Sequence, residues 1–182
     1  CGQLMKGDKM SDVKNYLDTV SLMIRSNDQM MKQRQEMKYS SMEHFFSELG
    51  QQFTAPSRPL TAYDIPLGEK KQCYKNCMDF VMNNPDTELL YCEGFALGCI
   101  PIAHAWLSTP QGEVFDPTWG KSYCTDYFGV AFDRSWAISL LLDKGSYGLV
   151  DDWEHKWPLL SHGYELEWKV KVKNDDSRTR LV

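Results

Sequence analysis

One stretch of the chain decides the predicted fold, residues 91–119, with the sequence YCEGFALGCIPIAHAWLSTPQGEVFDPTW. It contains two largely apolar runs, residues 101–108 and 113–116, which are separated by the sequence TPQG. Pro and Gly at a short break between apolar runs are typical of a tight turn, so these runs are predicted to form an antiparallel hairpin. Residues 87–95 predict a preceding strand, with Gly94 and Gly98 as breaks.

Helices are predicted on both sides of this hairpin. Apolar residues recur at helical spacing through residues 10–49, with Ser11 as N-cap and Gly50 at the end. Residues 69–83 predict another helix, which stops at the Asn-Asn-Pro sequence of residues 83–85. Residues 134–144 predict a third, capped by Asp133 and closed by Gly145.

The order of these elements predicts an α+β fold. Residues 51–68 contain three prolines and predict an extended connection, whereas residues 163–173 alternate polar and apolar side chains and predict a late edge strand. The length of 182 residues favours one domain over residues 10–175, with a helical N-terminal part (10–50) and a motif region (66–120). Residues 1–9 are expected to be a tag or disordered start, and residues 176–182 a disordered tail.

Composition excludes several classes of protein. A net charge of −5 argues against a nucleic-acid binder with a broad basic face. No apolar run approaches the roughly 18–20 residues that span a bilayer, so no membrane partner is expected. The N-terminus lacks an apolar signal region, which together with six cysteines in a chain this long predicts a cytoplasmic protein with reduced thiols.

Two residues predict a nucleophile and its base. Cys73 lies in the first turns of the predicted helix 69–83, where free N–H groups and the helix dipole favour a thiolate, and Lys70 and Lys71 act in the same direction. His104 interrupts the apolar strand PIAHAWL, where a histidine is unusual.

Asp116 ends the partner strand EVFDPTW. Pairing of Leu107 or Ser108 with residue 113 or 114 would bring His104 close to residues 116–118. A carboxylate across a hairpin can fix the tautomer of an imidazole, which then takes the thiol proton. The spacing therefore predicts a Cys73–His104–Asp116 triad.

The motifs QCYKN, HAWL and FDPTW resemble the Cys, His and Asp motifs of the transglutaminase-like branch of the papain-like cysteine enzymes. The resemblance covers roughly residues 66–120, and HAW followed by DPTW is its most specific part. Residues 91–119 also resemble a group of small bacterial or phage proteins of this kind. The resemblance implies an antiparallel sheet packed on the helix that bears the cysteine, with extra N-terminal helices.

Two functions remain open at this stage. The first is a thiol-dependent acyl-transfer enzyme that acts on a protein or peptide amide without cofactor or metal, by hydrolysis or transamidation, or an acetyltransferase-type use of the same triad. The second is an inactive module of the same fold that binds a protein partner, or a second copy of the chain, through its Met-rich N-terminal helices.

Other residues near the motifs have alternative interpretations. Cys92 is the rival nucleophile, although it is predicted to lie on a strand; a zinc site of cysteines and His104 matches the usual spacing poorly. Gln72 could donate to an oxyanion, and Glu93 could bind turn amides or line the cleft. Trp106 and Trp119 are expected to pack on the hairpin or wall the cleft. The remaining side chains are expected to be buried packing thiols (Cys77, Cys99, Cys124) or a solvated acidic loop (Asp151, Asp152, Glu154).

Overall fold

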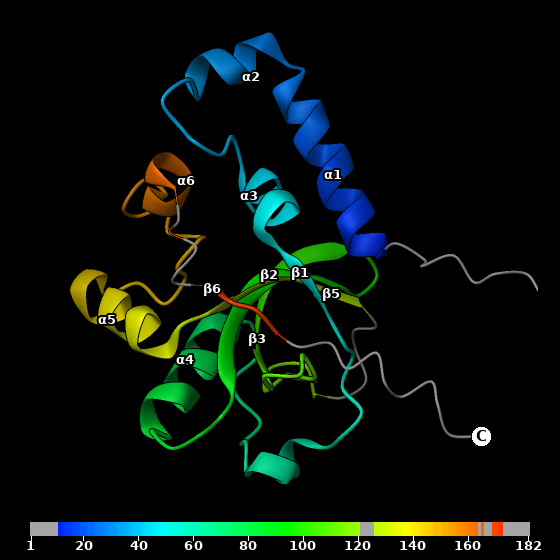
Figure 1. Ribbon diagram of the computed structural model, residues 1–182, viewed down its shortest axis with the longest axis vertical. Coiled ribbons are helices and arrows are strands. Elements are labelled where there is room, and N and C mark those ends of the chain that lie inside the picture. Colours follow the sequence, from blue (N-terminus) through cyan, green and yellow to red (C-terminus); the bar gives the residue numbers. More distant parts are fainter. Residues whose placement is uncertain (1–10, 121–125, 164, 166–168, 173–182) are drawn as a thin grey trace, which may run out of the picture.

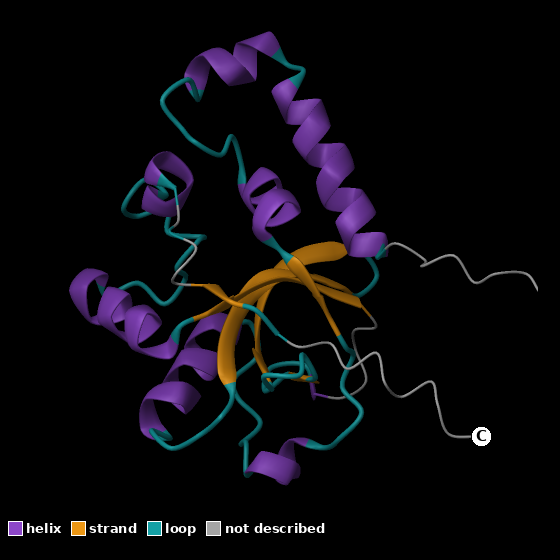
Figure 2. Ribbon diagram, in the orientation of Figure 1, coloured by secondary structure: helices purple, strands orange, loops and turns teal. Residues whose placement is uncertain are grey.

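The computed structural model of the chain describes residues 11–120, 126–163, 165 and 169–172. Among these residues, a curled antiparallel sheet is covered by helices, so the chain has an α+β architecture (Figures 1 and 2). The strands are β1 (Gln51–Phe53), β2 (Leu90–Leu97), β3 (Pro101–Ser108), β4 (Val114–Phe115), β5 (Asp126–Phe132) and β6 (Lys169–Val170). Their order is β1-β5-β2-β3-β4, and β6 pairs with β5.

The predicted hairpin forms with the expected register. Ser108 lies opposite Val114 and Leu107 lies opposite Phe115. The strand before it differs from its prediction, because β2 runs straight through Gly94 to Leu97. Gly94 is therefore no break: a Cβ on it would lie 2.5 Å from the Gly129 Cα and 2.8 Å from the Trp106 ring. The bare glycine lets β2, β5 and the indole approach closely.

The sheet separates two apolar clusters. Alternate residues of β2, β3 and β5 belong to a large cluster with the helices, including Phe95, Leu107 and Val130. The residues between them, including Cys92, Trp106 and Tyr127, form a smaller cluster on the opposite face. This alternation is the period of two that a strand imposes on its side chains.

The helices are α1 (Asp12–Arg25), α2 (Asp28–Gln33), α3 (Met42–Leu49), α4 (Cys73–Asn83), α5 (Arg134–Lys144) and α6 (Pro158–His162), with a 3-10 turn at Leu60–Tyr63. The prediction of continuous helical periodicity over residues 10–49 is wrong between α2 and α3, where residues 34–41 are not helical. Ser41 starts a new helix there, because its side chain accepts from the His44 N–H. The predicted α5 is confirmed with both caps, Asp133 and Gly145.

The N-terminal helices pack on the sheet. Helix α1 contacts α3, β5 and β2, and α3 contacts β5. Val13, Leu17 and Phe45 of the predicted apolar stripe are buried in the large cluster. None of the described helices is long and apolar enough to cross a bilayer.

Candidate active site

The hairpin brings His104 and Asp116 together. His104 lies on β3, and Asp116 directly follows β4, its hairpin partner. The His104 Nε2 and the Asp116 Oδ2 are 2.8 Å apart, and each residue is only 1 % exposed. A buried carboxylate at this distance holds the imidazole in one orientation and stabilises its protonated form.

Asp116 is itself held on every side. Its Oδ1 accepts from the backbone N–H groups of Thr118 and Trp119, both at 2.9 Å. Its Oδ2 accepts from the Tyr127 hydroxyl at 3.1 Å in addition to His104. These donors compensate the burial of the carboxylate and fix its direction.

Cys73 begins α4, which is tied to the same turn. The Asn76 side chain donates to the Thr118 hydroxyl at 2.9 Å, and the Gly68 N–H donates to the Pro117 carbonyl at 2.7 Å. The predicted helix began at residue 69, but the structure begins it at Cys73, so the half-buried thiol occupies its first position. There the first N–H groups of the helix have no carbonyl within it to bind.

The environment of His104 favours its protonated form. Burial alone would lower its pKa, but hydrogen bonds with Asp116 and with Cys73, and the charges of both partners, raise the pKa to about 9. The imidazole is therefore hydrogen-bonded to Asp116, and Cys73 is close enough to contribute to its pKa. With Nε2 directed at Asp116, Nδ1 is the ring nitrogen left for the thiol.

Only one of the two tryptophans contacts the His104 ring. The Trp119 ring stacks on the His104 ring, with centroids 3.7 Å apart and planes 6° from parallel. Trp106 is fully buried in the smaller cluster, with its ring edge-on to Tyr127. Trp119 thus covers one face of the imidazole, whereas Trp106 packs the sheet.

Gln72 and Glu93 lie in different environments, one exposed and the other buried. Gln72 is exposed at the N-cap of α4 and makes no side-chain cap hydrogen bond. Glu93 is buried and accepts from the Tyr91 hydroxyl and from the N–H groups of Leu149 and Val150, at 2.6–2.9 Å. Burial raises the pKa of Glu93 to about 7 against these hydrogen bonds. Its contacts are those of a residue that anchors a loop.

The other described cysteines differ from Cys73 in solvent exposure. Cys77 and Cys92 are fully buried, and burial raises the pKa of each thiol well above its usual value. Cys99 was expected to be buried but is exposed at the β2–β3 connection. Cys1 and Cys124 lie outside the described residues. Among those described, no His, Cys, Asp or Glu residues cluster as metal ligands.

The acidic loop is only partly solvated, contrary to expectation. Asp152 is buried, and its carboxylate has two partners: Oδ1 lies 2.8 Å from His155 Nδ1, and Oδ2 lies 3.6 Å from Lys144 Nζ. Two neighbours of the triad were also missed from the sequence, Tyr127 and Asn76. Tyr127 lies on β5, which was not predicted as a strand, whereas Asn76 falls one helical turn after Cys73 and could have been found from that spacing.

No protein-family model, curated protein or solved structure matches the chain.

Proposed function

We propose that the protein is a thiol-dependent acyl-transfer enzyme with Cys73 as nucleophile, His104 as general base and then acid, and Asp116 as the orienting carboxylate. One observation carries this proposal: the buried His104 Nε2 lies 2.8 Å from Asp116 Oδ2, and Cys73 is close enough to raise the pKa of the same ring. A nucleophile and a base in contact, with a third group orienting the base, form the common arrangement for covalent catalysis.

The proposed reaction starts from a Cys73 thiolate paired with protonated His104, the form of the imidazole that its raised pKa favours. The thiolate attacks an amide carbonyl carbon, and His104 returns the proton to the departing amine as the C–N bond breaks, leaving a thioester on Cys73. Water then completes hydrolysis, or a second amine completes transamidation. A protein or peptide amide is the proposed substrate, consistent with the resemblance of HAWL and FDPTW to the transglutaminase-like enzymes.

The surrounding residues support these roles. Trp119 covers one face of the imidazole and thereby limits access of water to it. Tyr127 and the two backbone donors keep the carboxylate pointed at Nε2. The Cys73 N–H, at the start of α4, is available to an oxyanion formed beside the thiol.

The test is alkylation by iodoacetamide at neutral pH, with the modified cysteine mapped by mass spectrometry. Cys73 should react at least tenfold faster than Cys99, although Cys99 is the more exposed of the two. His104→Gln should remove this difference while leaving the Cys99 rate unchanged. Equal rates for Cys73 and Cys99 in the folded wild-type protein would refute the proposal.

A second function, a non-catalytic binding module, is favoured by one specific observation. Leu22 and Met23 are adjacent on α1 and each is 67 % exposed. Apolar side chains at this exposure are available to a partner protein or a second copy. Such a module predicts that no thiol reacts faster than Cys99, so the same labelling experiment distinguishes the two functions.

A further inference from the structure

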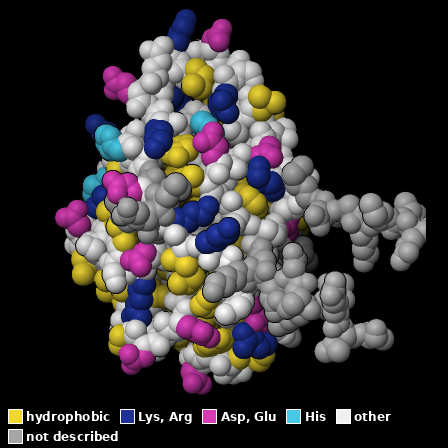
Figure 3. All heavy atoms as spheres, viewed as in Figure 1, with side chains coloured by type: hydrophobic (Ala, Val, Ile, Leu, Met, Phe, Trp, Pro, Cys, Tyr) yellow, Lys and Arg dark blue, Asp and Glu magenta, His cyan; other side chains and the backbone are white. Residues whose placement is uncertain are grey.

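Two adjoining hollows form one open groove between the segment of residues 34–41 and α6. The smaller hollow has a volume of about 250 Å³ and the larger about 690 Å³, and three residues line both of them: Arg34, Met37 and Trp157. Figure 3 shows His side chains beside Lys or Arg side chains on this part of the surface, over α6. The groove shares no residue with the proposed triad.

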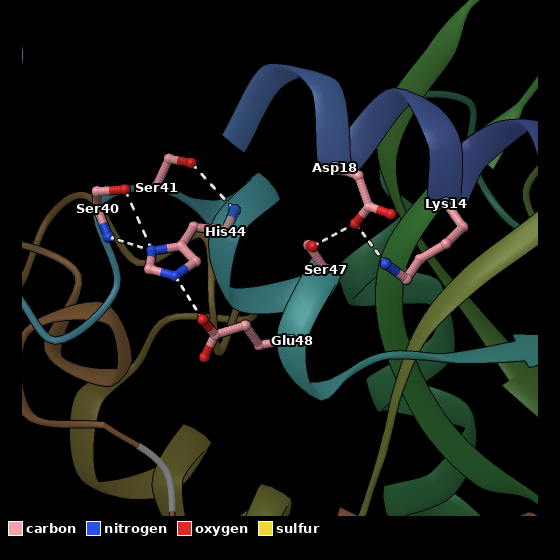
Figure 4. A network of polar contacts seen from close by, with 7 residues as sticks. All are labelled: Lys14, Asp18, Ser40, Ser41, His44, Ser47 and Glu48. Atoms are coloured by element: carbon pink, nitrogen blue, oxygen red, sulfur yellow. Dashed lines mark hydrogen bonds and ion pairs between the residues drawn. The ribbon is translucent and has the colours of Figure 1, made fainter. Parts of the chain in front are cut away.

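The wall formed by residues 34–41 is fixed by hydrogen bonds. Two N–H groups of this segment donate to carbonyls of α6, at 3.2 and 2.9 Å. The Ser40 N–H donates to His44 Nδ1 at 3.1 Å, and His44 Nε2 lies 2.8 Å from Glu48 Oε1 (Figure 4). A partner therefore meets a groove that is already formed, so that little ordering of the chain opposes binding.

Two residues on the opposite wall have a strained backbone. Lys156 and Trp157 are adjacent and have φ angles of 61° and 49°, in the left-handed region that residues other than glycine rarely adopt. The Trp157 N–H donates to the Asp152 carbonyl at 2.8 Å, which holds the turn in this conformation. Both side chains line the larger hollow, and Trp157 is 39 % exposed. Backbone strain of this kind is concentrated at binding and switch sites.

The larger hollow is basic, although the chain as a whole has a net charge of −5. The described residues that line it include three cations (Lys32, Arg34, Lys156), one carboxylate (Glu36) and two histidines (His155, His162). Lys32 and Lys156 are exposed, and no carboxylate in the described part of the chain lies within ion-pair distance of either. An acidic group on a partner would therefore pair with these lysines without displacing an existing ion pair.

The residues shared by the two hollows give the groove an apolar centre. A Met side chain adapts to different partners, and a Trp ring is a frequent anchor at protein interfaces, so Met37 and Trp157 suit an apolar side chain. The smaller hollow also contains Glu43 and Asp151, whose carboxylates would repel an acidic group. The acidic groups of a ligand therefore belong over the larger hollow, with an apolar group beside them at Met37 and Trp157.

We propose that this groove binds a peptide segment of a partner protein, in which acidic residues stand next to an apolar residue. The acidic residues pair with Lys32 and Lys156, and the apolar side chain packs on Met37 and Trp157. An open groove suits a peptide, whose chain continues beyond it, better than a small molecule, most of whose surface is usually enclosed. A nucleic acid is disfavoured, because the chain is acidic as a whole and few cations among the described residues line the groove.

The test selects peptides from a phage-displayed library of random short sequences on the full chain carrying Cys73→Ala, in which the proposed thiol chemistry cannot consume them. We expect enrichment of Asp and Glu beside apolar residues. The affinity of the most enriched peptide is then measured by fluorescence anisotropy. Lys156→Glu should raise its Kd about fivefold or more, because an exposed ion pair is replaced by a repulsion. Trp157→Ala should also raise the Kd, through loss of the apolar anchor.

Lys171→Glu is the matched control for Lys156→Glu. It makes the same change of charge at an exposed lysine that lines neither hollow, and it should leave the Kd nearly unchanged. The proposal is overturned if no acidic peptide is enriched over the starting library, or if Lys156→Glu and Lys171→Glu bind the enriched peptide equally well. A dimer in light scattering that Lys156→Glu dissociates would also overturn it, because the groove would then belong to a second copy of the chain.

Discussion

Replacing Asp116 with Asn should abolish the loss of stability that His104 causes between pH 6.5 and about 9. The pKa of His104 rises from 6.5 to about 9 on folding, because its hydrogen bonds with Asp116 and Cys73 outweigh the effect of burial. At about 1.4 kcal/mol for each tenfold change in proton affinity, this rise corresponds to a stabilisation of about 3 kcal/mol.

The sign of the effect follows from the raised pKa. A folded state that binds the His104 proton more tightly than the unfolded state gains its full stabilisation below pH 6.5 and loses it as the pH rises through about 9. In Asp116→Asn the main partner is neutral while burial persists, so the His104 pKa should fall below 6.5. The loss of stability between pH 6.5 and 9 should then disappear.

Urea unfolding at several pH values measures the stability, and NMR titration of the imidazole protons measures the pKa directly. Asp79→Asn is the matched control: it also removes one carboxylate, from an α4 side chain that pairs with Lys75. It should leave the His104 titration unchanged. A His104 pKa near 6.5 in the wild-type protein, or one that stays near 9 in Asp116→Asn, would refute the reasoning.

Three further predictions concern the fold. Because burial raises the pKa of Glu93 to about 7, its ionisation should cost stability as the pH rises from 4.5 to 7, and Glu93→Gln should remove this fall in urea titrations. Gly94→Ala should destabilise by roughly 3 kcal/mol or more by overpacking, whereas Gly98→Ala, with open space around it, should melt like the wild type. Deleting residues 10–50 should leave an insoluble or unfolded protein, because it removes buried side chains such as Leu17 and Phe45, each worth about 1.5–3 kcal/mol. A soluble fragment that unfolds cooperatively would contradict this prediction.

The hairpin and the His104–Asp116 pair were predictable because their determinants are local. The turn sequence between residues 108 and 113 fixes which residues of β3 and β4 face each other, and this register places Asp116 beside His104. The start of α4 was predicted four residues too early, but both the prediction and the structure place Cys73 near the N-terminus of this helix. Short-range geometry was sufficient for the hairpin and its His–Asp pair, whereas the place of Cys73 depends on the packing of α4 on β3.

The missed strands depend on pairing between distant parts of the chain. β1 and β5 lie side by side although their sequences are more than 70 residues apart, with Gln51 opposite Gly129. No short turn connects the two strands, so the sequence of either segment does not indicate its partner. Gly129 also interrupts the apolar pattern of β5, and only the fold shows why: it faces Gly94 across the β2–β5 pair under the Trp106 ring.

The contrast between the His104 and His44 networks shows what a sequence can reveal about buried polar residues. His104 is conspicuous because a histidine in an apolar strand requires a partner, and Asp116 is the acid that the hairpin supplies. His44 and Glu48 are four residues apart on a helix. Polar pairs at this spacing are common on exposed helix faces, so the sequence alone does not indicate a buried network. What distinguishes them is that Ser40 and His44 are buried beside a cavity, and burial there depends on α6, which closes over residues 38 and 39 through the Ser161 and Leu160 carbonyls. A cluster made by packing between distant segments is therefore visible only once the fold is known.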